Sequence, residues 1–416
     1  MKIKILFFFC LCSIFCFSQT KPKAAVTVNH PTRPTIASDC KKAIPIFLNN
    51  SFTYGVTPPL KGFGEIQEFK TNNSSTFEGE HNTAWYLLNI GKDGGLIFDI
   101  IPFDTTNDYD FLLYKYSDST FCDQLLKNKL KPVRSNLSNI TKSKKGITGL
   151  KPNILKNSVG EGVGISYSNS IEVKKGEKYM LILDNVTPEG KGHTIRFYFM
   201  KDVEINGKVT DSDSIPVVAD ITLTDNLGNT VQETKSDKNG NYKMKTSVIE
   251  NLNYNLSIVS DSTFIQTATI NTKTLKEAYE FKDLKVVLPK LKKGGNYTLG
   301  NINFYGNEAR LLPESVPSEE ALYKLMKRNK KMIIEILGHT NGEDWHLAPG
   351  YQSPEEKILS EDRAKTIYNY LVAKGIAADR MSTYGYGSTK ALYKNPKNAA
   401  EEQANRRVEI KVLVFD

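Results

Sequence analysis

The spacing of the apolar residues changes once along this chain, and that change limits its fold more than any other feature. From about residue 40 to residue 288, apolar and polar residues alternate in short runs, which is typical of β-strands. After Lys292-Lys293-Gly294-Gly295 the period becomes about 3.6, as in Leu322, Leu325 and Met326, which is typical of helices. The chain has 416 residues, too many for one ordinary domain. We therefore predict a multidomain protein with two all-β sandwiches followed by an α+β domain.

The first predicted sandwich covers residues 40–201. Its strand-like runs are short, rich in β-branched or aromatic residues, and separated by Gly, Asn and Asp turns. These runs lie at residues 85–90, 96–101, 111–116, 179–184 and 194–199.

The second predicted sandwich covers residues 202–288. It contains the segment Asp237-Lys238-Asn239-Gly240-Asn241, whose spacing also suggests the start of an EF-hand loop. Gly240 stands at the fourth position and Val248 at the twelfth, where a calcium loop needs other residues. The segment is therefore predicted to be a tight turn.

The first 18 residues have the pattern of an export signal. Lys2 and Lys4 precede an apolar run at residues 5–17, and the small Ser18 follows it. Lipid attachment is the alternative, because three cysteines lie in this segment, although each follows a large residue instead of a small one. Residues 19–39 are polar and contain prolines, so a tether is expected. No later apolar run approaches the roughly 20 residues of a spanning helix, so we expect no transmembrane span in the mature chain.

Removal of the signal would leave Cys40 and Cys122 as the only cysteines. Exported proteins can keep disulfides, and a bridge that closes a loop of about 80 residues constrains the unfolded chain. We therefore predict one disulfide between Cys40 and Cys122. Two separate thiols are the alternative.

The formal net charge of +9 is concentrated in the front part of the chain. Nine basic residues and no acidic ones lie between Lys127 and Lys156. No aromatic residue interleaves them as a single-strand nucleic-acid groove would need, so nucleic acid is not an expected partner. The stretch is either a solvated loop or a contact for an anionic surface such as cell wall, lipopolysaccharide or an acidic protein.

Both predicted sandwiches resemble known accessory modules. Residues 80–86, 108–111 and 176–179 resemble the jelly-roll modules attached to many secreted proteins. The second sandwich looks like the carboxypeptidase regulatory-like β-sandwich, a non-catalytic spacer. In the first sandwich, calcium is a possible cofactor, because three aspartates could supply oxygen ligands, and loop caps and turns are the alternative. These aspartates are Asp104, Asp108 and Asp110.

Six motifs after residue 300 closely resemble the OmpA-like peptidoglycan-binding domain. They are, in order, residues 301–304, 312–315, 335–340, 359–364, 384–387 and 405–410. The resemblance implies an α+β domain over residues 301–416, preceded by a linker at residues 289–300. It also implies binding to the diaminopimelate residue of the peptidoglycan stem peptide. Arg363 would hold the ligand carboxylate by paired N–H bonds, and the pocket would be completed by Asn341, Asn405 and Arg406, with backbone groups near Thr340.

The chain departs from this family where an acid should hold the ammonium group of the ligand. Asn341 stands there in place of Asp, and losing a charge-assisted hydrogen bond costs about tenfold to a hundredfold in affinity. The following loop is enlarged, so Glu343 or Asp344 could replace the missing carboxylate. Glu356 stands where the family often has Asn, and we expect it to close a capping box with Ser353.

Other interpretations of these residues remain open. Arg363 could pair with Glu361 or Glu409 as part of the fold. We expect no metal site, but a zinc site is the alternative for the side chains in or before the enlarged loop. These are His339, Glu343, Asp344 and His346.

The chain is expected to be non-catalytic. It contains no Gly-x-Ser-x-Gly, His-Glu-x-x-His or phosphate-loop pattern, and only five histidines. We predict a periplasmic anchor of a Gram-negative envelope that binds peptidoglycan and links a partner at the outer membrane, or in a secretion machinery, to the cell wall. Type IX secretion and gliding systems use chains of analogous architecture. The alternatives are a protein-interaction scaffold that has lost its wall ligand, and a surface glycan-binding or proteolysis-associated protein led by the jelly roll.

Overall fold

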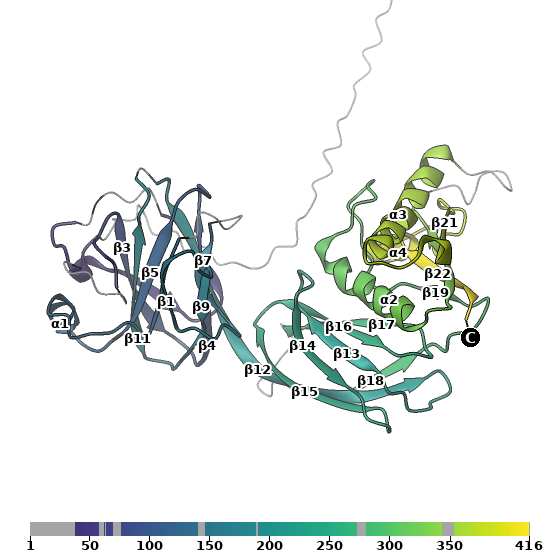
Figure 1. The fold of residues 1–416 in the computed structure, drawn as a ribbon, viewed down its shortest axis with the longest axis horizontal. Coiled ribbons are helices and arrows are strands. Elements are labelled where there is room, and N and C mark those ends of the chain that lie inside the picture. The colour runs from purple at the N-terminus through teal and green to yellow at the C-terminus, as the bar shows by residue number, and fades with distance from the viewer. Residues whose placement is uncertain are drawn as a thin grey trace, which may run out of the picture. The chain divides into compact units, whose positions relative to one another are not determined.

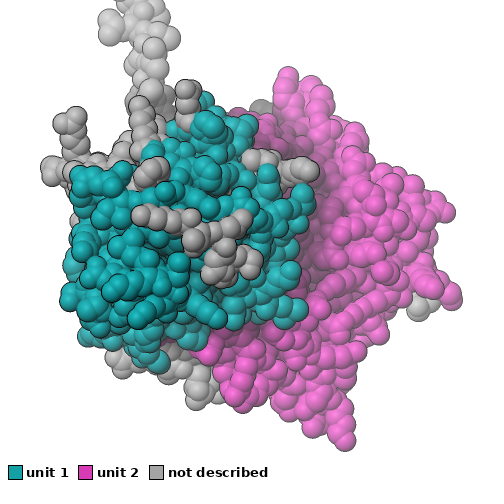
Figure 2. Space-filling view, turned by 60° about the vertical axis from the view of Figure 1, so that its left-hand side comes forward, with its two compact units in different colours: residues 1–198 teal, residues 199–416 magenta. Residues whose placement is uncertain are grey.

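The computed structural model describes residues 38–57, 62, 64–69, 76–139, 146–188, 190–272, 280–342 and 353–415. The chain divides into two compact units, residues 1–198 and residues 199–416, which Figure 2 shows in different colours. The predicted export signal at residues 1–18 lies outside the described residues, as does almost all of the predicted tether at residues 19–39. Among the described residues, no helix combines the length and the apolar character needed to cross a membrane.

The first unit consists mainly of β-strands (Figure 1). Its elements are η1 (Cys40–Lys42), β1 (Ile44–Leu48), β2 (Phe52–Thr57), β3 (Thr83–Ile90), β4 (Gly94–Pro102), β5 (Tyr109–Tyr116), α1 (Phe121–Leu126), β6 (Arg134–Ser138), β7 (Thr148–Lys151), β8 (Ser158–Gly162), β9 (Tyr167–Asn169), β10 (Ile171–Val173), β11 (Lys178–Asn185) and the start of β12 (His193–Asp211). All five runs expected from the alternation of apolar residues lie in strands, namely β3, β4, β5, β11 and β12.

Two sheets meet in the first unit. One has the strand order β1-β3-β11-β5-β6-β8, and the other joins β4 to β7 and β10, and β7 to β9. Aromatic side chains connect them, since the rings of Phe98 on β4 and Phe111 on β5 lie 5.3 Å apart. Cys40 and Cys122 form a disulfide with a Cα–Cα distance of 5.8 Å, which ties η1 to α1 within a buried cluster that includes Trp85.

The second unit begins with a β module. The later part of β12 pairs antiparallel with β15 (Asn241–Ile249) and parallel with β18 (Glu280–Leu288). A four-stranded sheet has the order β14-β13-β16-β17. Its strands are β13 (Asp220–Thr224), β14 (Thr230–Lys235), β16 (Asn253–Val259) and β17 (Gln266–Asn271). A buried cluster with Ile205 of β12, Ile221 of β13 and Leu256 of β16 joins these strands.

The segment that resembles an EF-hand start forms a tight turn. Oδ1 of Asp237 accepts hydrogen bonds from the backbone N–H groups of Asn239 and Asn241, each at 2.8 Å. Gly240 has φ +79°, a backbone conformation that side-chain-bearing residues rarely adopt. The three polar side chains therefore shape the turn.

The last part of the chain combines helices with a four-stranded sheet. Its elements are β19 (Asn296–Thr298), η3 (Pro313–Ser315), α2 (Val316–Arg328), β20 (Ile333–Gly338), α3 (Pro354–Ala373), η5 (Ala378–Arg380), β21 (Met381–Gly385), α4 (Ala399–Asn405) and β22 (Val408–Val414). The sheet order is β19-β22-β20-β21, with β20 and β21 parallel and β20 and β22 antiparallel. This is the α+β arrangement expected from the change of period.

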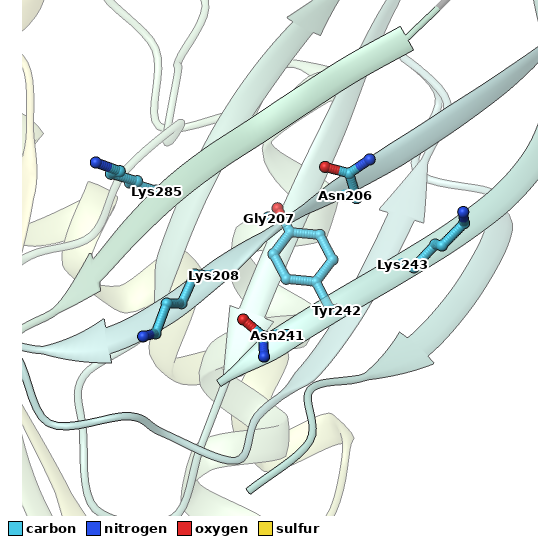
Figure 3. Close-up of a pocket in the computed structure, with 7 residues that line it drawn as sticks. All are labelled: Asn206, Gly207, Lys208, Asn241, Tyr242, Lys243 and Lys285. Carbon is cyan, nitrogen blue, oxygen red and sulfur yellow. The ribbon is translucent and has the colours of Figure 1, made fainter. Parts of the chain in front are cut away.

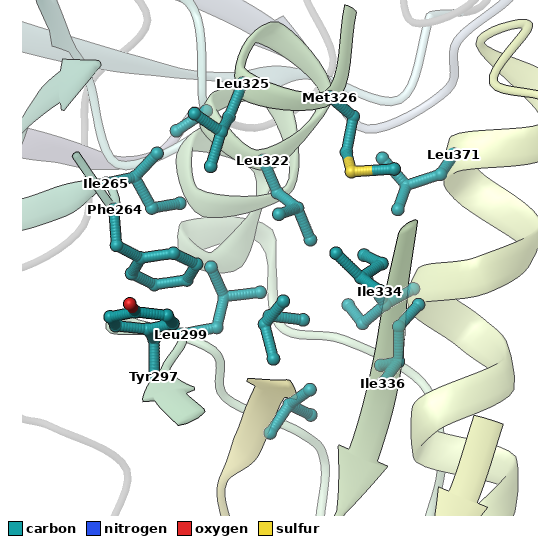
Figure 4. Close-up of a cluster of buried hydrophobic side chains, with 14 of the residues drawn as sticks. Phe264, Ile265, Tyr297, Leu299, Leu322, Leu325, Met326, Ile334, Ile336 and Leu371 are labelled. Carbon is teal, nitrogen blue, oxygen red and sulfur yellow. The ribbon is translucent and has the colours of Figure 1, made fainter. Parts of the chain in front are cut away.

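The β module and the last part of the chain share one hydrophobic core (Figure 4). Phe264 and Ile265, which precede β17, pack in the same cluster as Leu322 and Leu325 of α2. The ring of Phe264 is stacked on that of Tyr297, with centroids 4.7 Å apart. The predicted linker at residues 289–300 contributes Leu291, Tyr297 and Leu299 to this cluster. Burying these side chains stabilises both parts of the second unit together.

Candidate functional site

The residues expected to bind the wall come from three places in the last part of the chain. Thr340 and Asn341 follow β20, Arg363 lies on α3, and Asn405 and Arg406 lie at the end of α4. The backbone N–H of Thr340 donates to the carbonyl oxygen of Gly387, at 2.9 Å, so the segment after β20 lies beside the segment after β21. Strand ends of one sheet therefore hold these side chains against α3.

Asn341 and Asn405 are hydrogen-bonded to each other. Nδ2 of Asn405 donates to Oδ1 of Asn341, at 2.8 Å, and to the carbonyl oxygen of Tyr393, at 2.7 Å. Oδ1 of Asn405 accepts from the backbone N–H of Tyr393, at 2.9 Å, and Asn405 is buried. Asn405 thus holds Asn341 in place and already uses the acceptor oxygen of Asn341.

Arg363 is buried, with 1% of its surface exposed. Its Nε donates to the carbonyl oxygen of Glu308, at 3.1 Å, and its guanidinium lies over the ring of Phe304, 4.9 Å from the ring centroid. Burial and, to a lesser degree, the charge of Arg406 lower the pKa of Arg363 to about 10, against an opposing effect of Glu356. The guanidinium is still a cation at neutral pH. No carboxylate of the described residues lies within ion-pair distance of it.

The two acids considered as fold partners for Arg363 bind other groups. Glu361 accepts hydrogen bonds from Oγ1 of Thr383 and from the backbone N–H of Gly385. Glu409 pairs with Nε of Arg407, at 2.6 Å. Burial raises the pKa of Glu409, but the nearby His339 and hydrogen bonds from Asn296 and Arg407 outweigh it and lower that pKa to about 2. Neither acid neutralises Arg363.

Glu356 is a site residue that the sequence pattern assigned only to helix capping. The expected cap is present in part, since Oγ of Ser353 accepts from the backbone N–H of Glu356, at 3.1 Å. The Glu356 carboxylate extends to Gly342, because a Cβ added to this glycine would lie 2.7 Å from Glu356 Oε1. Its Oε2 is buried and has no hydrogen-bond partner among the described residues. The seven-residue separation of Glu356 and Arg363 on one helix is the sequence signal that could have shown this, because it places both on one face.

The enlarged loop lies mostly outside the described residues, and so do Glu343, Asp344 and His346. His339 is buried and stacks on Tyr386, with ring centroids 5.3 Å apart. Burial lowers the pKa of His339, although Glu409, whose Oε2 lies 3.6 Å from Nε2 of His339, opposes this. Within the described ranges, no group of three or more His, Cys, Asp or Glu side chains is arranged to hold a metal ion.

Two of the three aspartates considered for calcium line one pocket, and the third binds a threonine and a lysine. Asp104 accepts from Thr106 and pairs with Lys191 at 3.1 Å. Asp108 and Asp110 instead line a pocket of about 220 Å³ in the first unit, with Asp184 among its walls. Hydrogen bonds from Thr106 are the main reason why the pKa of Asp104 falls to about 2.

A second hollow, of about 570 Å³, lies on the β module (Figure 3). Lys208 of β12, Lys243 of β15 and Lys285 of β18 surround it, with Asn206, Gly207, Asn241 and Tyr242. Lys243 pairs with Glu204, at 2.6 Å. The hollow shares no residue with the Arg363 site.

Comparison with known proteins agrees with the C-terminal resemblance. The OmpA family matches residues 303–406. Outer membrane protein A of Escherichia fergusonii is 30% identical over 130 residues, which are 28% of this chain and 50% of that protein. A protein of Gloeobacter violaceus named photosystem I P700 chlorophyll a apoprotein A2 is 34% identical over 122 residues, 28% of this chain and only 10% of that protein.

One solved structure is similar to part of this chain. The cell wall anchor of the T6SS from Pseudomonas aeruginosa is 26% identical, and the match covers 26% of this chain and 73% of that one with a TM-score of 0.22. The chain spans at most half the length of the two curated relatives. Residues 303–406 of this chain form an OmpA-like domain.

Proposed function

We propose that this chain is a non-catalytic anchor that binds the diaminopimelate residue of the peptidoglycan stem peptide through its OmpA-like domain. The observation that carries the proposal is the buried guanidinium of Arg363, which no carboxylate of the described residues neutralises. Burying a charge without a counter-charge is costly. A ligand carboxylate that accepts two parallel N–H bonds would supply the counter-charge with good geometry.

The contacts of Arg363 leave its terminal nitrogens for such a ligand. Nε is used by the carbonyl oxygen of Glu308, and one face of the guanidinium is covered by Phe304. Both contacts fix the orientation of the planar group, so less freedom is lost when a ligand binds. Thr340 has a buried Oγ1 without a hydrogen-bond partner within the described ranges, which is a further polar group for the ligand.

The proposal includes a place in the cell. The similarity to outer membrane protein A supports the periplasm of a Gram-negative bacterium, between the outer membrane and the wall. The β modules of the chain would then reach a partner at the outer membrane or in a secretion machinery. A type IX system is one such machinery, by analogy of architecture alone.

A sacculus pull-down tests the wall-binding role. Purified residues 19–416 should sediment with peptidoglycan sacculi, and Arg363→Ala should release the protein, with affinity reduced about a hundredfold. Lys365→Ala is the matched control, because Lys365 lies on the same helix with 51% of its side chain exposed. The longer fragment is needed because Phe264 and Ile265 complete the core of the OmpA-like domain. Equal sedimentation of the wild type and Arg363→Ala would contradict the assignment of Arg363.

A protein-interaction scaffold is the second candidate function. Asn341 favours it, because this side chain brings no negative charge and is held by Asn405. A scaffold would sediment with sacculi no better than a non-binding control protein, and free diaminopimelic acid would not protect it from thermal unfolding. The pull-down therefore separates the two functions.

A further inference from the structure

We propose that Glu356 supplies the negative charge that holds the ammonium group of the ligand, in place of the acid that Asn341 has replaced. This inference rests on the proposed wall-binding function. It names a different residue from Glu343 and Asp344, the two acids of the enlarged loop. The site would then hold a zwitterion between Glu356 and Arg363, two charges on one helix.

The positions of Glu356 and Arg363 on α3 place them on the same side. Seven residues make two turns of a helix, so both side chains project from one face, with a rise of about 10.5 Å between their Cα atoms. The charge of Glu356 acts on Arg363 in the folded chain. The two groups do not form an ion pair with each other.

The Glu356 carboxylate lies next to the residue that follows Asn341. A Cβ on Gly342 would lie 2.7 Å from Glu356 Oε1 and 2.9 Å from Oγ of Ser388, distances that real Cβ atoms do not show. Gly342 therefore makes room for the carboxylate. The negative charge of Glu356 therefore lies beside Gly342, the residue after Asn341, and is supplied by α3.

The hydrogen-bond states of the two side chains differ. Oδ1 of Asn341 accepts from Nδ2 of Asn405, so Asn341 has a structural partner. Oε2 of Glu356 is buried and has no hydrogen-bond partner in the part of the chain that the structure describes. A buried carboxylate oxygen without a donor is unfavourable, and an ammonium group provides the strongest kind of donor for it.

The separation of Glu356 and Arg363 suits the end of an amino acid that carries both its ammonium and its carboxylate group. The ammonium nitrogen and the carboxylate carbon of such a zwitterion lie about 2.5 Å apart. Charge-assisted hydrogen bonds of about 2.8 Å at each end bring the total to about 8 Å between the two protein groups. The rise of about 10.5 Å between the two Cα atoms is of the same order as this distance.

Titration with two probes tests the inference. Meso-diaminopimelic acid carries both ammonium and carboxylate groups, whereas pimelic acid has the same seven-carbon chain without the ammonium groups. Glu356→Gln in residues 19–416 should weaken binding of diaminopimelic acid about tenfold to a hundredfold, as measured by calorimetry. Binding of pimelic acid should not weaken, since it has no ammonium group. Glu355→Gln, at the neighbouring exposed position, should change neither affinity.

Moving the charge back provides the second test. Asn341→Asp combined with Glu356→Gln should recover most of the lost affinity, whereas Asn341→Asp alone should change it less than tenfold. This rescue also excludes misfolding as the reason for the loss. Glu356 is overturned as the counter-charge if Glu356→Gln binds diaminopimelic acid like the wild type while Arg363→Ala does not bind it, and wall binding then stands. Absence of binding by the wild type overturns both proposals.

Discussion

The first unit and the OmpA-like domain bury charged side chains in different surroundings. In the first unit, Glu68 and Glu80 are 4% and 6% exposed, and Oε1 of Glu80 accepts from the backbone N–H of Glu68 at 3.2 Å. Burial raises the pKa of Glu68 to about 7 and that of Glu80 to about 9, and the nearby acids add to both shifts. In the OmpA-like domain, Glu409 has cationic and amide donors around it and a pKa of about 2.

The difference shows which buried charge is left for a ligand. Buried acids beside other acids become neutral by binding protons, and a buried acid beside an arginine stays ionised. Arg363 fits neither case, because an arginine keeps its proton and the described residues give it no carboxylate. Glu80 of the first unit is therefore neutralised by a proton, whereas Arg363 of the OmpA-like domain remains a cation that an external anion can neutralise.

The disulfide gives the largest expected effect on stability. It also lies beside the acids of the first unit. The backbone N–H of Cys40 donates to Oε1 of Glu68, at 2.8 Å. Replacing Cys40 and Cys122 by Ala should lower the free energy of unfolding of the first unit by about 4 kcal/mol, since the bridge spans 82 residues. Urea unfolding followed by the fluorescence of Trp85, with Trp345 replaced by Phe, would measure this. A loss below about 1 kcal/mol would mean that the acids are held without the bridge.

Replacing Glu409, in the OmpA-like domain, gives the next largest expected effect on stability. Glu409→Gln leaves the buried Arg407 without its counter-charge, so the second unit should lose about 3 kcal/mol. Helix loss during urea unfolding, followed by circular dichroism, reports on α2 and α3. Glu335→Gln is the matched control, because Glu335 pairs with Lys411 at a more exposed place and should lose about 1 kcal/mol or less. Equal losses for both variants would remove the distinction between buried and exposed pairs.

Local signals predicted the elements of the OmpA-like domain well. The start of α3 follows from Ser353 and Pro354, and its end from Gly375, which has φ +92° just beyond the helix. Leu322, Leu325 and Met326 are fully buried, as their helical spacing indicates. Such features depend on residues a few positions apart, so the sequence is sufficient for them.

Contacts between distant segments could not be predicted in this way. The alternation around Phe264 indicates a buried residue, but not that it packs on Tyr297 in the core of the OmpA-like domain. Glu356 fits a capping pattern, while its approach to Gly342 depends on how a loop from β20 meets α3. Whether Arg363 pairs with Glu361 or Glu409 also depends on which donors these acids already have.

Counted over a single pH unit, the smallest expected effect is a pH dependence that Glu80 should give the first unit. Its raised pKa keeps Glu80 protonated in the folded chain, whereas the unfolded chain ionises it near pH 4.5. Stability is therefore present below pH 4.5 and is lost as the pH rises toward 9, by up to about 1.4 kcal/mol per pH unit. Glu80→Gln cannot ionise, so its unfolding free energy relative to the wild type should rise between pH 5 and pH 8. Urea unfolding followed by Trp85 fluorescence would measure it.

A matched variant separates this effect from other titrations of the unit. Glu172→Gln changes an exposed acid on β10 and should follow the wild type at every pH. Glu68 titrates in part of the same range, with a pKa of about 7, so the wild-type slope should remain partly present in Glu80→Gln up to that pH. A constant difference between Glu80→Gln and the wild type from pH 5 to pH 8 would show that Glu80 is ionised in the folded unit. Glu80 would then need a cation to neutralise it, just as Arg363 needs an anion. The two units would no longer differ in how they neutralise their buried charges.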